Sequence, residues 1–349
     1  MIRVGIVGCN FGHSVHLPAF RIDRRCEVVA LAGANVARVE MLARDSGIEA
    51  AFGDWSALVE DERVDAVTIA TPPALQPTIA LRALALNKPV FVEKPLAVDL
   101  ETAAKLLEQA ASTRQPTIID FEFPEITAWR RAKALLVQGA IGKLRHVIVT
   151  WNVENAVTRL RLKNWKSSRD AGGGVLGNFV CHCLYYLEWF CGPFQRLSAR
   201  MFELPGRAAH EETTAVLTFD FRSGAAASLT VSCASYAGSG HRLEFYGEDG
   251  ALMLINEESD YIRGFRLVHA KRPNNRTPIP VDDPLENVHA DGRIAPVARL
   301  AARFIDTIEG GKVAEPTLTH GYRVQQLMAA ARRSHDLGTW VDVEAEVSK

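Results

Sequence analysis

The chain has 349 residues, and its 40 lysine and arginine residues against 41 aspartate and glutamate residues give a formal net charge of −1. This balance excludes the broad cationic surface with which a chain binds nucleic acid or an anionic membrane. An apolar fraction of 48% excludes disorder for most of the length. At about 150 residues per domain, two or three domains are predicted.

The six cysteines include no Cys-x-x-Cys pair, and a chain of this size needs no disulfide framework. Cys181, His182 and Cys183 are consecutive, and neighbours on a helix point in different directions, so we expect no metal site there. Residues 1–8 are typical of a strand and lack the pattern of an export signal. The uncharged run at 171–187 is too short to cross a bilayer. We therefore expect reduced cysteines, no membrane partner and a cytoplasmic location.

The first part of the chain alternates short β-rich runs with helical patterns. Strands are predicted at residues 3–7, 27–31, 66–70, 90–93 and 117–121, and helices at 14–23, 36–46, 55–60, 74–86 and 100–112. Asp54 is a plausible N-cap for the helix at 55–60. This alternation predicts an α/β fold whose N-terminal domain, residues 1–121, is a Rossmann-type doubly wound parallel sheet.

The pattern changes after residue 121. Helices are predicted at 128–137, 176–190, 295–308 and 322–334, and strands at 146–153, 215–221, 226–233, 242–246 and 251–255. Gly-Glu-Asp-Gly at 247–250 is a good hairpin turn, and the Pro- and Asn-rich residues 270–290 are expected to form a surface arm. Residues 122–349 therefore predict a second, α+β domain with a large, mostly antiparallel open sheet.

A candidate phosphate loop follows the first strand. Residues 8–13 are Gly-Cys-Asn-Phe-Gly-His, which match a shortened Gly-x-Gly-x-Gly pattern at Gly8 and Gly12. The loop opens the first predicted helix, where backbone N–H groups and the helix dipole favour a pyrophosphate. Asn10 replaces a glycine, and asparagine tolerates positive φ better than most residues. The loop predicts dinucleotide binding, and the alternative is an ordinary strand–helix turn.

The end of the second strand bears on the choice of cofactor. NAD-preferring sites usually carry an acid there, which accepts from the ribose 2′-hydroxyl. This chain has Gly-Ala-Asn at 33–35, with Asn35 in place of a carboxylate and Arg38 one turn later. Arg38 is either a ligand for a 2′-phosphate or a solvated helix residue. We expect NAD or NADP, with a slight preference for NADP.

Three further segments carry a family resemblance. Ala-Thr-Pro-Pro at 70–73 and Glu-Lys-Pro-Leu at 93–96 each follow a predicted parallel strand, and Gly-Gly-Gly-Val-Leu at 172–176 precedes His182. With the loop at 8–13, they make residues 2–193 resemble the glucose–fructose oxidoreductase / inositol dehydrogenase (Gfo/Idh/MocA) family. The resemblance implies a Rossmann domain, a second domain whose open sheet forms an oligomer interface, and reversible hydride transfer between a nicotinamide and a carbinol carbon of a sugar, cyclitol or related compound.

Lys94 is the principal catalytic candidate within this resemblance. It follows a parallel strand, beside the crevice in which such folds bind ligands. Oxidation of a carbinol needs a group that takes the hydroxyl proton, and a lysine near a cationic ring or in a dry pocket can have its pKa lowered enough to help. Pro95 can sustain a cis bond, as is frequent in the family. The alternative is a lysine in a surface turn.

Asn178, His182 and Tyr185 lie on the predicted helix at 176–190. Asn178 and His182 are four residues apart and therefore share a helix face. The family commonly has Asp at the positions of Asn178 and Tyr185, and an amide can orient a hydroxyl but cannot accept its proton. The resemblance therefore gives the acid–base work to Lys94 and His182, with Tyr185 as a further candidate, and the positioning of the hydroxyl to Asn178. The alternative for His182 is a hydrogen-bonded core histidine.

The remaining candidates belong to the cofactor. In the family that the chain resembles, histidine is frequent at the position of Gln76, and the position of Glu122 is commonly acidic and near the nicotinamide. An aromatic residue often precedes the Gly-rich segment, and the resemblance implies that Trp165 covers the cofactor. The complete set of predicted cofactor contacts is Gly8, Asn10, Phe11, Gly12, Asn35, Arg38, Thr71, Pro72, Gln76, Glu93, Lys94, Glu122 and Trp165.

A run of cations without an acid precedes the Gly-rich segment. Its members are Arg159, Arg161, Lys163, Lys166 and Arg169. The alternation of the first three with leucines favours an exposed strand edge protected by charge. The other interpretation is an anion subsite for a phosphorylated, carboxylated or nucleotide-linked substrate.

The sequence therefore predicts an NAD(P)-dependent oxidoreductase of CH–OH groups, with a small sugar-like substrate, anionic if the cation run serves it, and a homodimeric or homotetrameric assembly. Two alternatives remain. One is a cofactor-binding regulator without turnover, which Asn10, Asn178 and Tyr185 make credible. The other is a glycosidase that uses tightly bound NAD transiently. Net reduction of the cofactor by a substrate separates the oxidoreductase from both.

Overall fold

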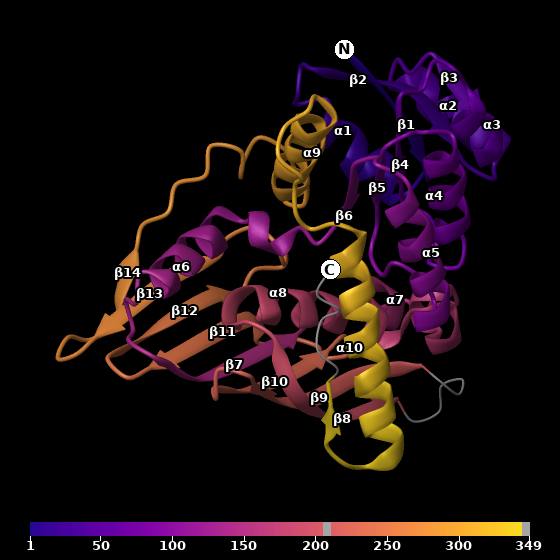
Figure 1. The fold of residues 1–349 in the computed structure, drawn as a ribbon. Helices are drawn as coiled ribbons and strands as arrows, with labels where there is room; N and C mark the ends of the chain where they lie inside the picture. The colour runs from indigo at the N-terminus through magenta and orange to yellow at the C-terminus, as the bar shows by residue number, and fades with distance from the viewer. Residues whose placement is uncertain (205–210, 344–349) are drawn as a thin grey trace. The chain divides into compact units, whose positions relative to one another are not determined.

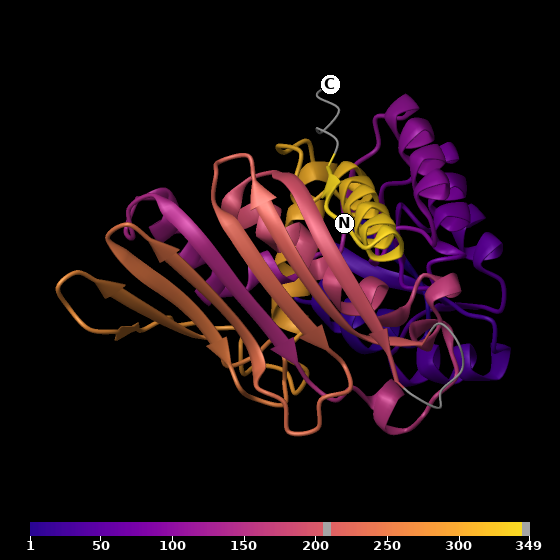
Figure 2. The ribbon, with the colours of Figure 1, turned by 90° about the horizontal axis from the view of Figure 1, so that it is seen from below.

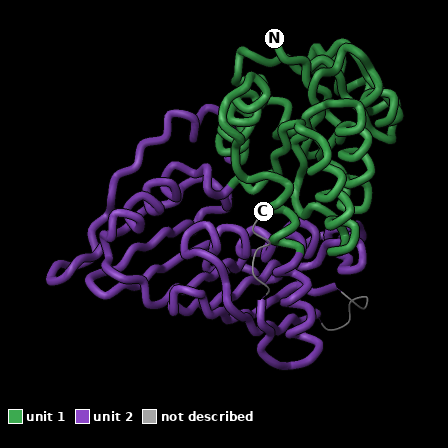
Figure 3. The backbone as a smooth tube through the Cα atoms, viewed as in Figure 1, with its two compact units in different colours: residues 1–122, 293–325 green, residues 123–292, 326–349 purple. Residues whose placement is uncertain are grey.

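The computed structural model describes residues 1–204 and 211–343, and the chain divides into two compact units (Figure 3). The first unit consists of residues 1–122 and 293–325, and the second of residues 123–292 and 326–349. The expected domain limits, 1–121 and 122–349, divide the chain once, whereas the chain passes between the two units three times. The domain limits at 121 and 122 therefore stay a prediction.

A six-stranded parallel sheet forms the centre of the first unit. Its strand order is β3-β2-β1-β4-β5-β6, and every neighbouring pair is parallel. Successive strands are added on one side of β1 up to β3 and on its other side from β4 onward, so the strand order reverses between β1 and β4. Open α/β sheets bind ligands at such a reversal, beyond the carboxyl ends of the strands. The predicted Rossmann-type doubly wound sheet is confirmed.

The elements of the first unit agree with the predicted ones in type and order, with one added strand, β3. The strands are β1 Ile2–Val7, β2 Cys26–Ala32, β3 Ala50–Phe52, β4 Ala66–Ile69, β5 Val90–Val92 and β6 Thr117–Ile119; the helices are η1 Gly12–His16, α1 Leu17–Phe20, α2 Val36–Asp45, α3 Trp55–Glu60, α4 Gln76–Ala85, α5 Leu100–Ser112 and α9 Ile294–Ile308.

Local sequence explains where these elements begin. Asp54, the predicted N-cap, accepts a hydrogen bond from the backbone N–H of Ser56 and starts α3. Asp99 accepts from the backbone N–H of Thr102 and starts α5, and each such cap contributes about 1 kcal/mol. Every residue of β4 is buried, as expected for a strand covered on both faces.

Helix α9 belongs to the first unit although it lies late in the chain. Its apolar stripe contributes Val297, Leu300 and Phe304 to the same buried cluster as Val4 and Phe91. A stripe of this kind must be buried against another element. This packing explains why residues 293–325 return to the first unit.

A nine-stranded sheet dominates the second unit, with strand order β14-β13-β12-β11-β7-β10-β9-β8-β15. The β7–β10 pair is parallel, and the other pairs are antiparallel, so the predicted mostly antiparallel sheet is confirmed. The strands are β7 Leu144–Asn152, β8 Phe194–Glu203, β9 Glu212–Phe221, β10 Ala226–Ser232, β11 Gly240–Gly247, β12 Gly250–Asn256, β13 Arg266–Lys271, β14 Thr277–Ile279 and β15 Val341–Asp342.

The helical segments of the second unit complete the list: η2 Phe123–Glu125, α6 Thr127–Val137, α7 Ala156–Arg159, η3 Trp165–Ser167, η4 Arg169–Ala171, η5 Leu176–Val180 and α8 Cys181–Cys191, while α10 Leu318–Leu337 begins in the first unit and ends in the second. Figure 1 shows α6 and α8 along one face of the sheet. In Figure 2 the opposite face of the sheet is turned toward the viewer, and these helices lie behind the sheet.

Two local expectations are met with added detail. The arm expected at 270–290 is largely exposed, and it contains β14, which pairs with β13 and extends the sheet by one strand. Its Pro278 stands at the outer edge, where a missing N–H donor is tolerated. The single helix expected at 176–190 is a π-helical turn, η5, followed by α8. Helical spacing of 3.6 residues per turn therefore does not hold around Asn178.

None of the helices in residues 1–204 and 211–343 combines the length and the apolar character needed to cross a bilayer.

Candidate active site

The loop after β1 packs so closely on the neighbouring residues that two of its positions have no room for a side chain. Gly8 has φ +128°, and a Cβ there would lie 2.3 Å from the carbonyl oxygen of Ala70. At Gly12 a Cβ would lie 2.8 Å from Cγ2 of Ile6. Both positions therefore require glycine, one for its backbone conformation and both for space. The result is a turn with bare backbone that leads into η1, the kind of cradle in which a pyrophosphate is bound.

A hydrogen bond joins the side chains of Asn10, in this loop, and Arg38, on α2. One guanidinium nitrogen of Arg38 donates to Oδ1 of Asn10 at 2.8 Å and to the carbonyl of Cys9 at 3.2 Å. Asn35 is the N-cap of α2, where its side chain accepts from the backbone N–H of Arg38. Asn10 is not among the residues with positive φ, so its role in the loop is to accept from Arg38 and not to relieve backbone strain.

Gln76 ties together the loops that follow β4 and β5. Its Nε2 donates to the carbonyl of Pro95 at 2.7 Å, and the Lys94–Pro95 bond is cis. Within the described residues, Oε1 of Gln76 and Oγ1 of Thr71 are buried without a hydrogen-bond partner. Buried polar atoms usually have a hydrogen-bond partner. The Gln76 oxygen, which can accept, and the Thr71 hydroxyl, which can donate or accept, therefore suit a polar ligand at this edge of the sheet.

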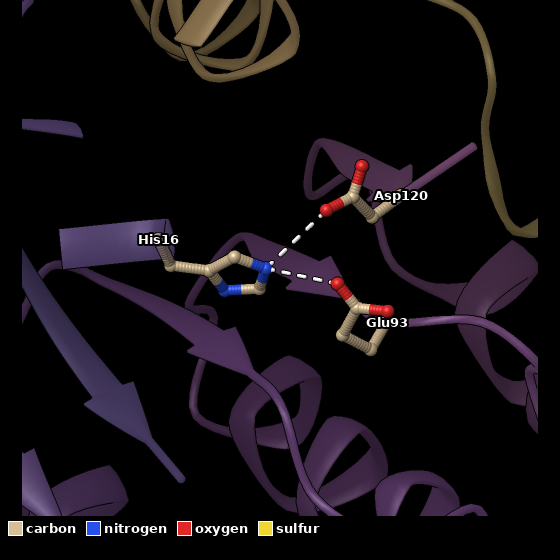
Figure 4. A group of neighbouring side chains, drawn as sticks. All are labelled: His16, Glu93 and Asp120. Carbon is tan, nitrogen blue, oxygen red and sulfur yellow. Dashed lines mark hydrogen bonds and ion pairs between the residues drawn. The ribbon is translucent and has the colours of Figure 1, made fainter. Parts of the chain in front are cut away.

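A buried charged cluster lies at the carboxyl ends of β5 and β6 (Figure 4). Nε2 of His16, on η1, lies 3.1 Å from Oε1 of Glu93 and 3.3 Å from Oδ2 of Asp120. Nδ1 of His16 lies 2.6 Å from Oγ1 of Thr68 on β4. The imidazole and Asp120 have no exposed side-chain surface, and Glu93 is nearly as buried. Glu93 was predicted from the sequence; His16 and Asp120 were not.

Glu122 follows Asp120 by two residues and is also buried. Burial, aided by the charge of Glu93, raises the pKa of Glu122 to about 7, against the opposing charges of Lys94 and Arg293. The guanidinium of Arg293 lies 5.0 Å from the centre of the Phe11 ring. The predicted residues Lys94, Glu93 and Glu122 therefore share one charged environment in the first unit.

In the second unit, the Gly-rich segment packs on the backbone around Trp165. A Cβ at Gly173 would lie 2.1 Å from the carbonyl oxygen of Trp165, so this position also requires glycine. Asn178, on η5, donates from Nδ2 to the carbonyls of Lys166 at 2.7 Å and Gly174 at 2.9 Å. Its amide thus fastens the segment that holds Trp165. The Lys166 ammonium lies 5.7 Å from the centre of the Trp165 ring.

His182 is buried on α8 within an aromatic cluster. Its ring centre lies 5.0 Å from that of Phe123 and 6.2 Å from that of Trp151. Tyr185, also on α8, is 8% exposed. The neighbouring Tyr186 hydroxyl contacts Nε2 of His241 at 3.0 Å, and burial lowers the pKa of His241 to about 3. The aromatic cluster and His241 were not predicted, because these contacts join residues between 31 and 59 positions apart in the sequence.

The cation run at 159–169 does not form the predicted strand edge. Arg159 ends α7, Lys166 lies in η3 and Arg169 begins η4. Arg161 has φ +53°, which interrupts any extended run. The strand-edge interpretation is therefore wrong, and the anion-subsite interpretation stays a prediction.

The candidate residues of the first unit are suited to holding a dinucleotide. The glycine cradle accepts a phosphate against bare backbone, and Thr71 and Gln76 offer buried polar atoms beside the strand ends. The described residues hold one group with metal-ligand spacing, His16, Glu93 and Asp120, whose ligand atoms lie within 4.8 Å of one another. Structural zinc sites have four protein ligands, and this group supplies three.

Protein-family models match most of the chain. The one described as an oxidoreductase family with an NAD-binding Rossmann fold matches residues 2–121, and the GFO/IDH/MocA C-terminal domain matches residues 129–253. An uncharacterized oxidoreductase of Synechocystis is 31% identical over 98% of this chain and 96% of its own. A levoglucosan dehydrogenase of Pseudarthrobacter phenanthrenivorans is 23% identical over 98% of each chain.

The fold is that of known dehydrogenase structures. A levoglucosan dehydrogenase in complex with NADH superimposes with a TM-score of 0.86 at 21% identity, over 98% of this chain and 99% of that one. At this identity the likeness is one of fold.

Proposed function

The chain belongs to the Gfo/Idh/MocA family of NAD-binding oxidoreductases, and from that premise we propose that it transfers a hydride between a nicotinamide and the carbinol carbon of a sugar, cyclitol or related polyol. The observation that carries the proposal is the first unit's arrangement, in which the glycine cradle leads through η1 to the buried cluster beside Lys94. The levoglucosan dehydrogenase relative supports a sugar-like substrate.

The nicotinamide, when bound, supplies the hydride acceptor or donor. In our proposal, Lys94 takes the hydroxyl proton when the alcohol is oxidised and returns it in the reverse direction. His182 assists as the second acid–base group, and its burial among aromatic rings excludes water from the imidazole. Tyr185, on the same helix, is a further candidate for proton transfer.

Asn178 acts in this proposal through the segment that it fastens. Its Nδ2 donates hydrogen bonds to the backbone carbonyls of Lys166 and Gly174. The amide nitrogen is thus engaged, and Asn178 keeps Trp165 and the Gly-rich segment in place. We propose that it orients the reacting hydroxyl with Oδ1, the one part of the side chain that can accept a proton donor.

The cofactor preference follows from Arg38. Residues 33–35 supply no carboxylate that would repel a 2′-phosphate, and the Arg38 guanidinium already lies at the loop, bound to Asn10. We propose that Arg38 contacts the adenosine ribose and gives a modest preference for NADP over NAD, since a guanidinium binds phosphate oxygens strongly.

The uncovered face of the nine-stranded sheet is proposed as the interface between two copies of the chain. Its centre carries Thr150, Thr218 and Thr230, which alternate with buried residues. A separate apolar cluster around Met253 packs against Tyr246 and Val268 on the neighbouring strands of this sheet. Short polar side chains beside an apolar cluster suit a second sheet of the same kind, so we propose a homodimer or homotetramer.

The proposed reaction is tested by incubating the protein with NAD or NADP and a panel of sugars, cyclitols and their phosphorylated or carboxylated forms. Formation of reduced nicotinamide with at least one polyol is expected. Saturable cofactor binding without turnover on any of them would favour a regulator, and cleavage of a glycoside without net reduction would favour a glycosidase.

A further inference from the structure

His16 occupies a position that links the phosphate loop to the strand end that carries Lys94. The ring lies at the end of η1, which Gly12 begins, and Phe11 meets it edge to face at 5.3 Å. On its other side the ring reaches Glu93, the residue before Lys94, and Asp120. One side chain therefore contacts β4, the residues that directly follow β5 and β6, and Phe11 of the cofactor loop.

The ring faces one hydroxyl and two carboxyl groups. Nδ1 lies at hydrogen-bond distance from Oγ1 of Thr68, which can donate or accept, and Nε2 lies between the carboxyl groups of Glu93 and Asp120. Burial by itself would lower the pKa of His16, but the hydrogen bonds and charges of Asp120 and Glu93 raise it to about 9. The ring is thus an imidazolium at neutral pH.

The two carboxyl groups respond differently to this cation. Although burial acts against ionisation, the hydrogen bond and charge of His16 keep the pKa of Glu93 below its usual value. Burial and the charge of Glu93 raise the pKa of Asp120 well above its usual value. The cluster therefore pairs His16 with two carboxyl groups, of which Glu93 is the more acidic.

We propose that His16 is a positioning residue for the reaction: its imidazolium anchors Glu93 and thereby fixes the strand end from which Lys94 projects. This inference rests on the proposed function of Lys94. The other charged groups around the cluster are Glu122 after β6, Lys94 after β5 and Arg293 before α9. An uncharged side chain at position 16 would leave Glu93 buried without its cation, which is costly.

The charge state of His16 is tested without any activity measurement. NMR of protein labelled with ¹⁵N in histidine, with the His16 signal assigned by its loss in His16→Gln, should show both ring nitrogens protonated up to about pH 8. A neutral ring at pH 7 would overturn the proposal. So would a stoichiometric divalent metal that is lost in His16→Gln, since a metal-bound Nε2 cannot donate to Glu93.

The positioning role is tested by kinetics. His16→Gln should lower kcat at least tenfold, leave the Kd for NADH within threefold, and abolish the fall in kcat that titration of His16 produces above about pH 9. Asp120→Asn, added to His16→Gln, removes one buried carboxyl and should restore kcat at least threefold. An unchanged kcat in His16→Gln contradicts the positioning role. So does an equal loss of kcat and NADH affinity in His16→Gln that Asp120→Asn does not restore.

Two further measurements separate the possible failures. If His16→Gln does not fold, Thr68→Val removes the Nδ1 partner and should move the alkaline fall in kcat to lower pH; an unmoved profile contradicts the proposal. A wild-type protein that reduces neither cofactor with any polyol refutes the proposed function and the positioning role together. Normal wild-type turnover with unchanged His16→Gln turnover refutes the positioning role alone.

Discussion

The side-chain amide of Gln76 and the carbonyl of Pro95 join the loops that follow β4 and β5 by a 2.7 Å hydrogen bond. Gln76 is fully buried, so water cannot replace the bond. Gln76→Leu should destabilise the protein by about 1–3 kcal/mol, because it leaves the Pro95 carbonyl without its donor. Urea unfolding measures this. Gln109→Leu, at an exposed position on α5, is the control and should stay within about 0.5 kcal/mol; equal losses would contradict a specific role for Gln76.

The cofactor cradle depends on the absence of a side chain at position 12. Gly12→Val should abolish NADH and NADPH binding, since even a Cβ at this position would lie 2.8 Å from Ile6. Fluorescence titration measures the binding, and circular dichroism checks that the variant is folded. Ala51→Val, on an exposed position of β3, should bind as the wild type does. A folded Gly12→Val protein with normal affinity for NADH and NADPH would show that the dinucleotide does not bind at this loop.

Lys94 is expected to matter for turnover far more than for cofactor affinity. Lys94→Ala should lose about 10²–10⁴-fold in kcat, the usual contribution of a positioned acid–base group, while the Kd for NADH stays within a few-fold. His182→Ala should lose a similar factor. Lys105→Ala, an exposed lysine paired with Glu101 on α5, is the control. An active wild type whose Lys94→Ala and His182→Ala variants both turn over normally would refute the assignment.

Glu122 makes the protein less stable as pH rises. Its pKa is about 7 in the folded chain against 4.5 for an ordinary glutamate, so between these values the folded state binds more protons than the unfolded one. The free energy of unfolding must then fall with rising pH over this window, by up to roughly 3 kcal/mol. Glu122→Gln should remove this fall, as measured by urea unfolding at pH 4.5 to 7.

Glu108→Gln, an exposed change on α5, should leave the pH dependence intact. A Glu122→Gln variant whose stability changes with pH as that of the wild type does would show that Glu122 is ionised in the folded protein throughout.

The open sheet face should hold two copies together. Thr230→Glu places a like charge from each copy at the centre of the proposed interface and should shift the protein to monomer in light scattering. Ser112→Glu, at an exposed position in the first unit, should leave the assembly unchanged. A wild type that is already monomeric at micromolar concentration contradicts the interface.

Features set by neighbouring residues could be predicted, and contacts between distant residues could not. The limits of α3 and α5 follow from local caps and periodicity, and the predicted and observed ranges coincide. The loops at 8–13 and 93–96 are recognisable because their chemistry lies in consecutive residues. The strand β3 is Ala-Ala-Phe and lacks the β-branched residues that mark the equally short β5 and β6. The β14 strand is hidden by its proline, which is tolerated only because β14 is an edge.

The cluster around His16 shows why part of the candidate site was missed. His16 and Asp120 are 104 positions apart, and their approach depends on the order in which β4, β5 and β6 lie in the sheet. The available signal was weak: an acid directly after a buried strand, and a histidine on an apolar helix. Together with Glu93, those two residues would have suggested a buried charge that needs a partner.

Transfer of deuterium tests the central claim most directly. A polyol that supports turnover is labelled with deuterium at its carbinol carbon and incubated with the protein and oxidised cofactor. We expect the label to appear on the nicotinamide ring, in one equivalent per ketone formed, and Lys94→Ala to slow this transfer without preventing cofactor binding. Ketone formation with the deuterium released to water, or no labelled nicotinamide with any polyol of the panel, would contradict hydride transfer by this protein.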